Sequence, residues 1–92
     1  MSLNNCDEIS HRLLTSLHPE VCELHDDSAA HHGHAGAASG GGHYTVKIVC
    51  KQFEGLNRIS RHRLVYDAVG DMMHKEIHAL SIFALTPTEI QT

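Results

Sequence analysis

Hydrophobic residues recur with a helical period near the beginning of the chain. Ile9, Leu13 and Leu17 follow one another at intervals of four residues, which predicts an amphipathic helix over residues 5–17. Pro19 comes just after this segment, where a helix is expected to stop. The chain is therefore predicted to open with one helix that buries a single face.

Alternation of polar and apolar residues replaces the helical period in three later segments. Residues 21–25 alternate loosely and predict a brief strand. The alternation is stronger in the second segment, where Tyr44, Val46 and Ile48 share one face. We expect these two segments to form an antiparallel hairpin with a long loop. Residues 77–85 form an apolar run with alternation, which predicts a central or well-covered strand.

A second helical stripe lies between the last two predicted strands. Asn57 or Ser60 can cap this helix, and Gly70 interrupts its apolar face, so we expect a helix followed by a separate turn. The apolar positions of the stripe are Leu64 or Val65, Ala68 or Val69, and then Met72 and Met73. Thr86 and Pro87 predict a final short helix, with Thr86 as its cap.

The predicted order of elements is helix, strand, strand, helix, strand, helix. A length of 92 residues leaves room for one core, so we expect a single domain over residues 1–92. A strand–helix–strand crossover favours a parallel, right-handed connection between the second and third strands. The expected fold class is therefore α+β, a small two-layer domain with a three-stranded mixed sheet and helices on one face.

The segment between the first two predicted strands differs in composition from the rest of the chain. Residues 26–42 (DDSAAHHGHAGAASGGG) are mostly small and show no periodicity, which predicts a flexible loop. The loop holds His31, His32 and His34, and the chain has ten histidines in all. Histidine is the commonest metal ligand in proteins. A loop of this kind also binds zinc, copper or nickel adventitiously, so metal binding by the isolated protein would not by itself define a function.

The three cysteines, Cys6, Cys22 and Cys50, are widely spaced and include no C-x-x-C pair. This sparse, odd set predicts free thiols rather than a disulfide framework or a zinc ribbon, with Cys22 and Cys50 buried. We therefore expect an intracellular, reducing location, in the cytoplasm or the mitochondrial matrix. No apolar run approaches the ~20 residues that span a bilayer. Residues 1–8 resemble neither a secretory signal nor an arginine-rich transit peptide.

Basic residues are concentrated in the middle of an acidic chain. The formal net charge is −4, yet five of the seven basic residues lie between positions 47 and 63. They are Lys47, Lys51, Arg58, Arg61 and Arg63. This segment predicts a docking surface for a partner protein or, against the overall charge, for nucleic acid. No phosphate loop, paired carboxylates or nucleophile–base set is visible, so an enzyme is not expected.

Four separated motifs in this chain resemble the BolA family. They are Phe53-Glu54-Gly55-Leu56, Arg61-His62-Arg63-Leu64-Val65-Tyr66, Ile77-His78-Ala79-Leu80-Ser81-Ile82 and Leu85-Thr86-Pro87. The motifs occur in the order and spacing of that family, and the similarity covers residues 8–90. The resemblance implies a fold related to type II KH domains, with the order α-β-β-α-β-α. A KH domain would carry a GXXG clamp between two helices, and residues 54–63 contain no such pair of glycines.

The resemblance also implies a partner and a cofactor. BolA-like proteins pair with a monothiol glutaredoxin and share a [2Fe–2S] cluster, which the glutaredoxin holds through a cysteine and a bound glutathione. The isolated BolA-like protein carries no cluster. The family's ligand at the start of the last strand corresponds to His78, and a second ligand comes from the loop between the first two strands. The alternative ligands in this chain are His34, His31, His32 and His43.

One of these candidates fits the family pattern better than the others. A subgroup with a Gly-His-Ala loop motif and a histidine opening the second strand matches Gly33-His34-Ala35 and His43, which favours His34 as the second ligand. His34 and His78 converge only if the loop folds over the end of the last strand. Imidazole can replace thiolate on cluster iron, and this exchange raises the reduction potential.

Two functional hypotheses follow from these patterns. The leading hypothesis is a non-enzymatic partner of a monothiol glutaredoxin in iron–sulfur cluster assembly, trafficking or iron regulation. The alternative is a KH-like, nucleic-acid-binding transcriptional regulator that uses residues 47–63. His62 belongs to the predicted docking surface in both, although we expect its main role to be a hydrogen bond across a turn at the helix start.

Overall fold

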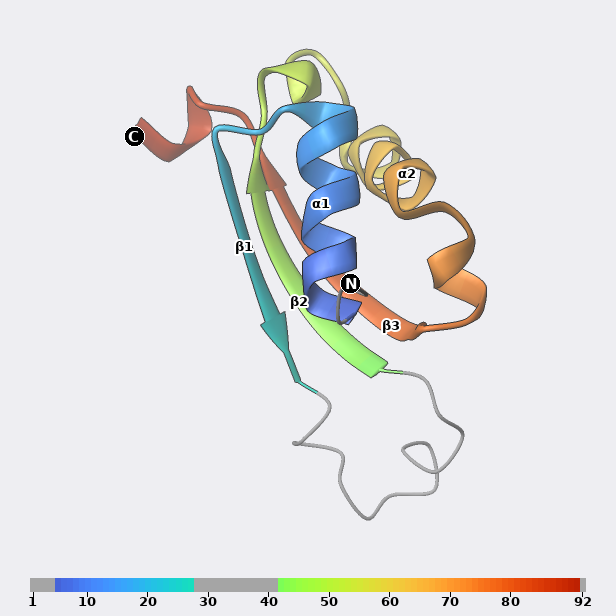
Figure 1. Cartoon of the computed structure of the whole chain (residues 1–92). Helices are drawn as coiled ribbons and strands as arrows, with labels where there is room; N and C mark the ends of the chain where they lie inside the picture. Colours follow the sequence, from blue (N-terminus) through green and yellow to red (C-terminus); the bar gives the residue numbers. More distant parts are fainter. Residues whose placement is uncertain (1–4, 28–41, 92) are drawn as a thin grey trace.

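The structure, a computed structural model, is a three-stranded sheet with both α-helices packed on one face (Figure 1). It describes residues 5–27 and 42–91. In chain order the elements are α1 (Asn5–Leu17), β1 (Val21–Asp26), β2 (Gly42–Val49), the 3-10 turn η3 (Lys51–Phe53), α2 (Arg58–Val69), η4 (Gly70–His74), β3 (Ile77–Leu85) and η5 (Glu89–Gln91). The predicted order and the α+β two-layer class are confirmed. Within the described residues, no helix is long and apolar enough to cross a membrane.

β2 is the central strand, and its two neighbours run in opposite directions relative to it. β1 pairs with β2 antiparallel, with Val21 opposite Val49. β3 pairs with β2 in parallel, with Leu85 beside the same Val49. The predicted hairpin and the predicted parallel crossover through α2 are therefore both present.

β3 is an edge strand, which corrects the expectation of a central or well-covered strand over residues 77–85. The sheet order is β1–β2–β3, so β3 is paired along one side. Ile82 pairs in register with the buried Val46, whereas Phe83 on the opposite face is 58% exposed. The apolar run misled the prediction because apolar residues occupy the open face of this strand as well as its packed face.

The hydrophobic core lies between the helices and one face of β2. The three β2 residues that were predicted to share a face are all buried: Tyr44, Val46 and Ile48. They pack against the predicted helix stripes, whose buried residues are Ile9, Leu13, Leu17, Val65 and Val69. Removal of this apolar surface from water is the main favourable term in folding.

All three cysteines are free thiols, as predicted. The Cys50 thiol is buried and donates a hydrogen bond to the Leu17 carbonyl oxygen at 3.1 Å. Cys22, in the edge strand β1, is only partly buried, which corrects the expectation that it would be buried. Burial raises the pKa of the Cys22 thiol, and the same cause raises the pKa of Cys6. Both thiols therefore stay protonated at neutral pH, in the less reactive form.

α2 begins and ends at residues that the sequence identified. The side-chain oxygen of Asn57 accepts a hydrogen bond from the backbone N–H of Ser60 at 2.8 Å, which caps the first turn. The helix ends at Val69, and Gly70 has a φ of 60°, in a region that residues with side chains rarely adopt. η4 follows directly, so the predicted helix and separate turn are both found.

Substitutions at two sheet residues test which face of the sheet contributes more to the free energy of unfolding. Ile48→Ala should lower the free energy of unfolding by about 2–5 kcal/mol, because Ile48 is fully buried and its removal leaves a cavity. Phe83→Ala, on the exposed face, should change it by no more than about 0.5 kcal/mol. Urea denaturation of both variants gives the comparison. Equal losses would contradict a core confined to the helix-covered face.

Candidate functional site

Two histidines meet at one end of the sheet. His43 is the second residue of β2, and His78 is the second residue of β3. Because these strands are parallel, their first residues lie at the same end of the sheet. The pairing shifts its register between Gly42 and His43. The two imidazole rings lie 5.0 Å apart, centroid to centroid, with an angle of 44° between their planes.

Hydrogen bonds hold the backbone on both sides of this pair. The N–H of Asp27 donates to the His43 carbonyl oxygen at 2.7 Å, and the N–H of Gly42 donates to the Glu76 carbonyl oxygen at 3.0 Å. The Thr45 hydroxyl donates to the Asp27 carboxylate. The beginning of β2 is therefore tied both to the end of β1 and to the turn that precedes His78.

Gly42 lies against a buried aromatic ring at the same place. A Cβ atom at position 42 would lie 2.6 Å from the Tyr44 side chain, and Tyr44 is only 4% exposed. Such a contact is far inside the ordinary van der Waals separation, so any side chain at this position would displace the Tyr44 ring. Glycine is the residue that lets the chain enter β2 here.

The structure brings together part of the predicted ligand set. His78 and His43 are neighbours, whereas His31, His32 and His34 lie outside the described residues. The segment that carries these three histidines rejoins the sheet at Gly42, whose N–H bonds to Glu76 only two positions before His78. Gly42, at the end of the loop, is thus attached near the start of β3. A loop histidine can meet His78 only if the loop reaches this place.

The spacing of the two imidazole rings is compatible with one metal centre but does not complete it. With metal–nitrogen bonds of about 2 Å, two imidazoles on one ion have centroids roughly 5 Å apart, and the observed separation is 5.0 Å. Within residues 5–27 and 42–91, no group of three or more His, Cys, Asp or Glu side chains could hold a metal ion. A metal held between His43 and His78 would therefore need further ligands from the loop or from a second molecule.

Arg61, one of the predicted docking residues, forms its hydrogen bonds inside the molecule. Its Nε donates to the Leu56 carbonyl oxygen at 2.9 Å, and its Nη1 donates to the Ala84 carbonyl oxygen at 3.0 Å. The guanidinium also makes a two-pronged ion pair with Glu89, at 2.8 and 3.2 Å. With 14% of its side chain exposed, Arg61 joins α2, β3 and the C-terminal turn rather than projecting toward a partner.

Glu89 completes this anchor and was missed by the sequence analysis. The Thr86 N–H donates to the Glu89 carboxylate at 2.8 Å, and the Glu89 N–H donates to the Thr86 hydroxyl at 3.2 Å, so the two residues form a capping box. The Arg61 guanidinium, helped by the Thr86 N–H, lowers the pKa of Glu89 to about 2. The predicted final helix is present as the short turn η5. The Thr-x-x-Glu spacing was the signal that could have identified Glu89.

The remaining predicted docking residues do not form one surface. Lys47 lies on the open face of β2, beside Phe83 and away from the helices. Lys51 is 81% exposed in η3 and lies 3.9 Å from a carboxylate oxygen of Glu20. Arg63 is exposed on α2, in the helical layer. Their role in docking stays a prediction.

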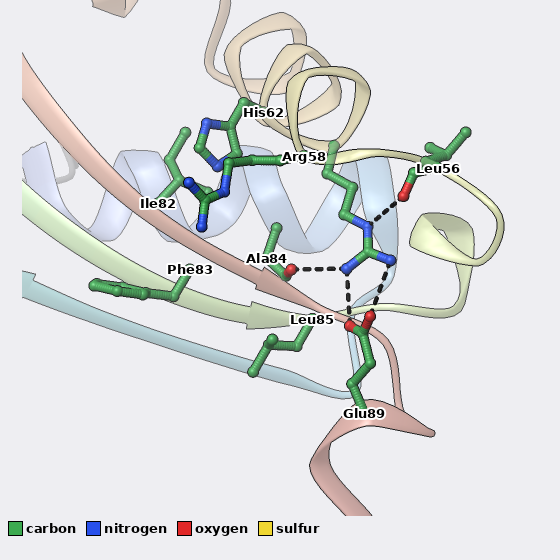
Figure 2. Close-up of a pocket in the computed structure, with 9 residues that line it drawn as sticks. Leu56, Arg58, His62, Ile82, Phe83, Ala84, Leu85 and Glu89 are labelled. Carbon is green, nitrogen blue, oxygen red and sulfur yellow. Dashed lines mark hydrogen bonds and ion pairs between the residues drawn. The ribbon is translucent and has the colours of Figure 1, made fainter.

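Arg58 and His62 line a groove of about 400 Å³ between the beginning of α2 and β3 (Figure 2). The expected hydrogen bond from His62 across a turn is not found, since within the described part of the chain its side chain makes no hydrogen bond. Figure 2 shows Arg58 and His62 over Ile82, with Phe83 on the other side of the strand. Both side chains are therefore available to a ligand in this groove.

The match to a known family covers most of the chain. The family described as "BolA-like protein" matches residues 13–89. The chain belongs to the BolA family. The family that was inferred from the four motifs is thereby confirmed.

Two BolA-family relatives and one solved structure document the similarity. "Protein BOLA1, chloroplastic" from Arabidopsis thaliana is 39% identical over 89 residues, which cover 94% of this chain and 56% of the relative. "SufE-like protein 1, chloroplastic/mitochondrial" from the same plant is 38% identical over 87 residues, which cover 89% of this chain and 24% of the relative. This chain thus spans about half the length of the first relative and a quarter of the second. The structure "BolA1 from Arabidopsis thaliana" superposes with a TM-score of 0.82 at 38% identity, over 97% of this chain and 98% of that one.

Because of the Arg61–Glu89 ion pair, we expect the free energy of unfolding of this BolA-family protein to depend on pH in the acidic range. The pKa of Glu89 is lowered from 4.5 to about 2, so its ionised form stabilises the fold at pH values above about 5. This contribution should disappear as the pH falls from about 4.5 to about 2. Glu89→Gln should therefore be less stable than the wild type at pH 7, and the difference should shrink over that interval.

Urea denaturation at a series of pH values measures this difference. Glu23→Gln, an exposed carboxylate on β1 outside the Arg61 contact, is the matched control. A wild-type advantage over Glu89→Gln that stays constant from pH 7 to pH 2 would show that the ion pair is not its source.

Proposed function

We propose that this BolA-family protein is a non-enzymatic partner of a monothiol glutaredoxin and shares a [2Fe–2S] cluster with it through histidine ligands. The observation that carries the proposal is the approach of His43 and His78 to 5.0 Å at the end of the sheet where the loop joins β2. His78 supplies one ligand from β3. The second ligand is His34, which the family resemblance favours, or His43, which lies beside His78.

The donor set suits half of a shared cluster better than a structural zinc site. A structural zinc site takes four protein ligands, whereas the described residues bring two imidazoles together and hold no larger group of ligands. Iron–sulfur clusters accept two histidines on one iron in place of two cysteines. The cysteine and the glutathione thiolate of a glutaredoxin would then hold the other iron.

The proposed role lies in iron–sulfur cluster assembly or trafficking, or in iron regulation. It rests on the family resemblance and on a relative named SufE-like protein 1, within which a BolA-like segment makes up a quarter of the length. The names of the two plant relatives assign them to the chloroplast, or to the chloroplast and mitochondrion. For this chain we propose a reducing compartment inside the cell, the cytoplasm or the mitochondrial matrix.

Reconstitution with a monothiol glutaredoxin, glutathione, iron and sulfide under anaerobic conditions tests this function. The wild-type protein should give a heterodimer whose visible absorption and circular dichroism differ from those of the glutaredoxin homodimer. His78→Ala should abolish that difference because it removes the ligand from β3. Comparison of His43→Ala with His34→Ala identifies the second ligand as the residue whose loss also restores the homodimer spectrum.

His25→Ala is the matched control, since His25 is an exposed histidine of β1 that lies outside the pair. It should leave the heterodimer spectrum unchanged. If the wild-type protein fails to alter the glutaredoxin spectrum at all, the shared cluster is disproved. An effect of His25→Ala equal to that of His78→Ala would point to unspecific metal capture by histidines.

A second candidate function is supported by the name of one relative. A Vibrio cholerae protein that is 34% identical over 85 residues is named "DNA-binding transcriptional regulator BolA". Lys47 and Arg58 lie in different layers here, and Arg61 already pairs with Glu89, so five cations do not converge on one phosphate track. If nucleic acid is nevertheless the ligand, its affinity should fall log-linearly with salt, whereas the cluster spectrum should not.

A further inference from the structure

The outer edge of β3 presents unpaired backbone groups. The Leu85 carbonyl oxygen accepts from the Cys50 N–H and so faces β2, whereas the Ala84 carbonyl oxygen faces outward and accepts from Arg61. Because successive residues of a strand turn their backbone groups to opposite sides, Ile82 and Leu80 also face outward. In the described part of the chain, no hydrogen bond occupies the N–H or C=O of either residue.

The groove described above runs beside this edge. Its apolar lining includes Leu56, Ile82 and Phe83, and the exposed fraction of Phe83 is 58%. A chain lying along β3 could thus exchange backbone hydrogen bonds with Ile82 while its side chains cover these apolar residues. Strand addition to an exposed edge is a general mode of peptide recognition.

The basic side chains of the groove determine which kind of peptide it favours. Within the described residues, Arg61 is matched by Glu89, but Arg58 makes no ion pair. Arg58 and His62 stand together on the wall of the groove opposite β3 (Figure 2). An occupant that brings a carboxylate to this wall gains a charge-assisted hydrogen bond that the free protein lacks.

We propose that the β3 edge binds an extended acidic peptide segment of a partner protein as a fourth strand of the sheet. The backbone of the peptide pairs with Ile82, a carboxylate of the peptide meets Arg58 and His62, and an apolar side chain covers Phe83. This site is distinct from the histidine pair, because Ile82 lies four residues, or roughly 13 Å, along β3 from His78. It does not depend on cluster binding.

The features of the groove favour a peptide over single-stranded nucleic acid. A nucleic-acid backbone cannot continue the ladder of N–H and C=O groups along Ile82 and Leu80. Apart from Phe83, the lining residues of the groove include no aromatic ring of Phe, Tyr or Trp on which bases could stack.

The test uses the full chain and a blocked eight-residue peptide that alternates glutamate and valine. Amide hydrogen exchange should slow at Ile82 on binding, because its N–H becomes paired. A peptide that is N-methylated at the residues facing β3 should lose binding, whereas the same peptide methylated at the alternate residues should retain it. A peptide that alternates lysine and valine should bind at least about tenfold more weakly.

Variants of the protein test which basic side chain binds the carboxylates of the peptide. Arg58→Glu should weaken binding of the acidic peptide by about tenfold or more, and Phe83→Ala should also weaken it. Lys51→Glu, an equal charge reversal at a side chain that is 81% exposed outside the groove, should change affinity by less than about twofold. Circular dichroism verifies that each variant is folded.

Three results would overturn the proposal. The first is peptide binding without protection of the Ile82 amide, and the second is equal affinity for both N-methylated peptides. The third is binding of a single-stranded oligonucleotide at Arg58 and Ile82 with no binding of the acidic peptide, which would assign the groove to nucleic acid.

Discussion

The parallel pairing of β2 with β3 is the constraint on which both sites depend. Parallel neighbours begin at the same end of a sheet, so His43 and His78 become adjacent although a whole crossover separates them along the chain. The crossover itself is α2, which packs along β3 and brings Arg58 and Arg61 to its outer edge. An antiparallel third strand would separate the histidines and leave the basic helix without the groove.

Arg61 shows how a basic residue can belong to the scaffold instead of the surface. One guanidinium satisfies carbonyl oxygens of Leu56 and Ala84 and neutralises Glu89, so three segments of the chain meet at one side chain. A partly buried charge is tolerated there because its donors have partners. The Ala84 carbonyl is also removed from the open edge, which shortens the stretch of β3 that could pair with another copy.

Much of the fold was readable from residue patterns, because those patterns are local or periodic. The spacing of Ile9, Leu13 and Leu17 gave α1, and the alternation through Tyr44 and Val46 gave the buried face of β2. The parallel crossover followed from the order of elements and from handedness. The family resemblance placed His78 at the start of the last strand, and it is the second residue of β3.

What escaped prediction depends on contacts between distant parts of the chain or on position within the sheet. Periodicity cannot tell an edge strand from a central one when apolar residues occupy both faces, so β3 and the exposed Phe83 were misjudged. The Arg61–Glu89 pair joins residues 28 positions apart, and only the closed fold reveals it. The local register shift between Gly42 and His43, which places His43 opposite Ala79 instead of His78, likewise has no sequence signature.

Gly42 limits how the histidine-bearing segment of this chain can join the sheet. Lengthening a loop costs little, since each doubling adds only about 0.6 kcal/mol of closure entropy. The junction between this loop and β2 tolerates less change, because any Cβ at position 42 would lie 2.6 Å from the buried Tyr44 ring. Changes in the length of the upstream segment should therefore be tolerated, provided that the residue before His43 has no side chain. Gly42 is thus the point in this chain at which the preceding segment can join the buried part of β2.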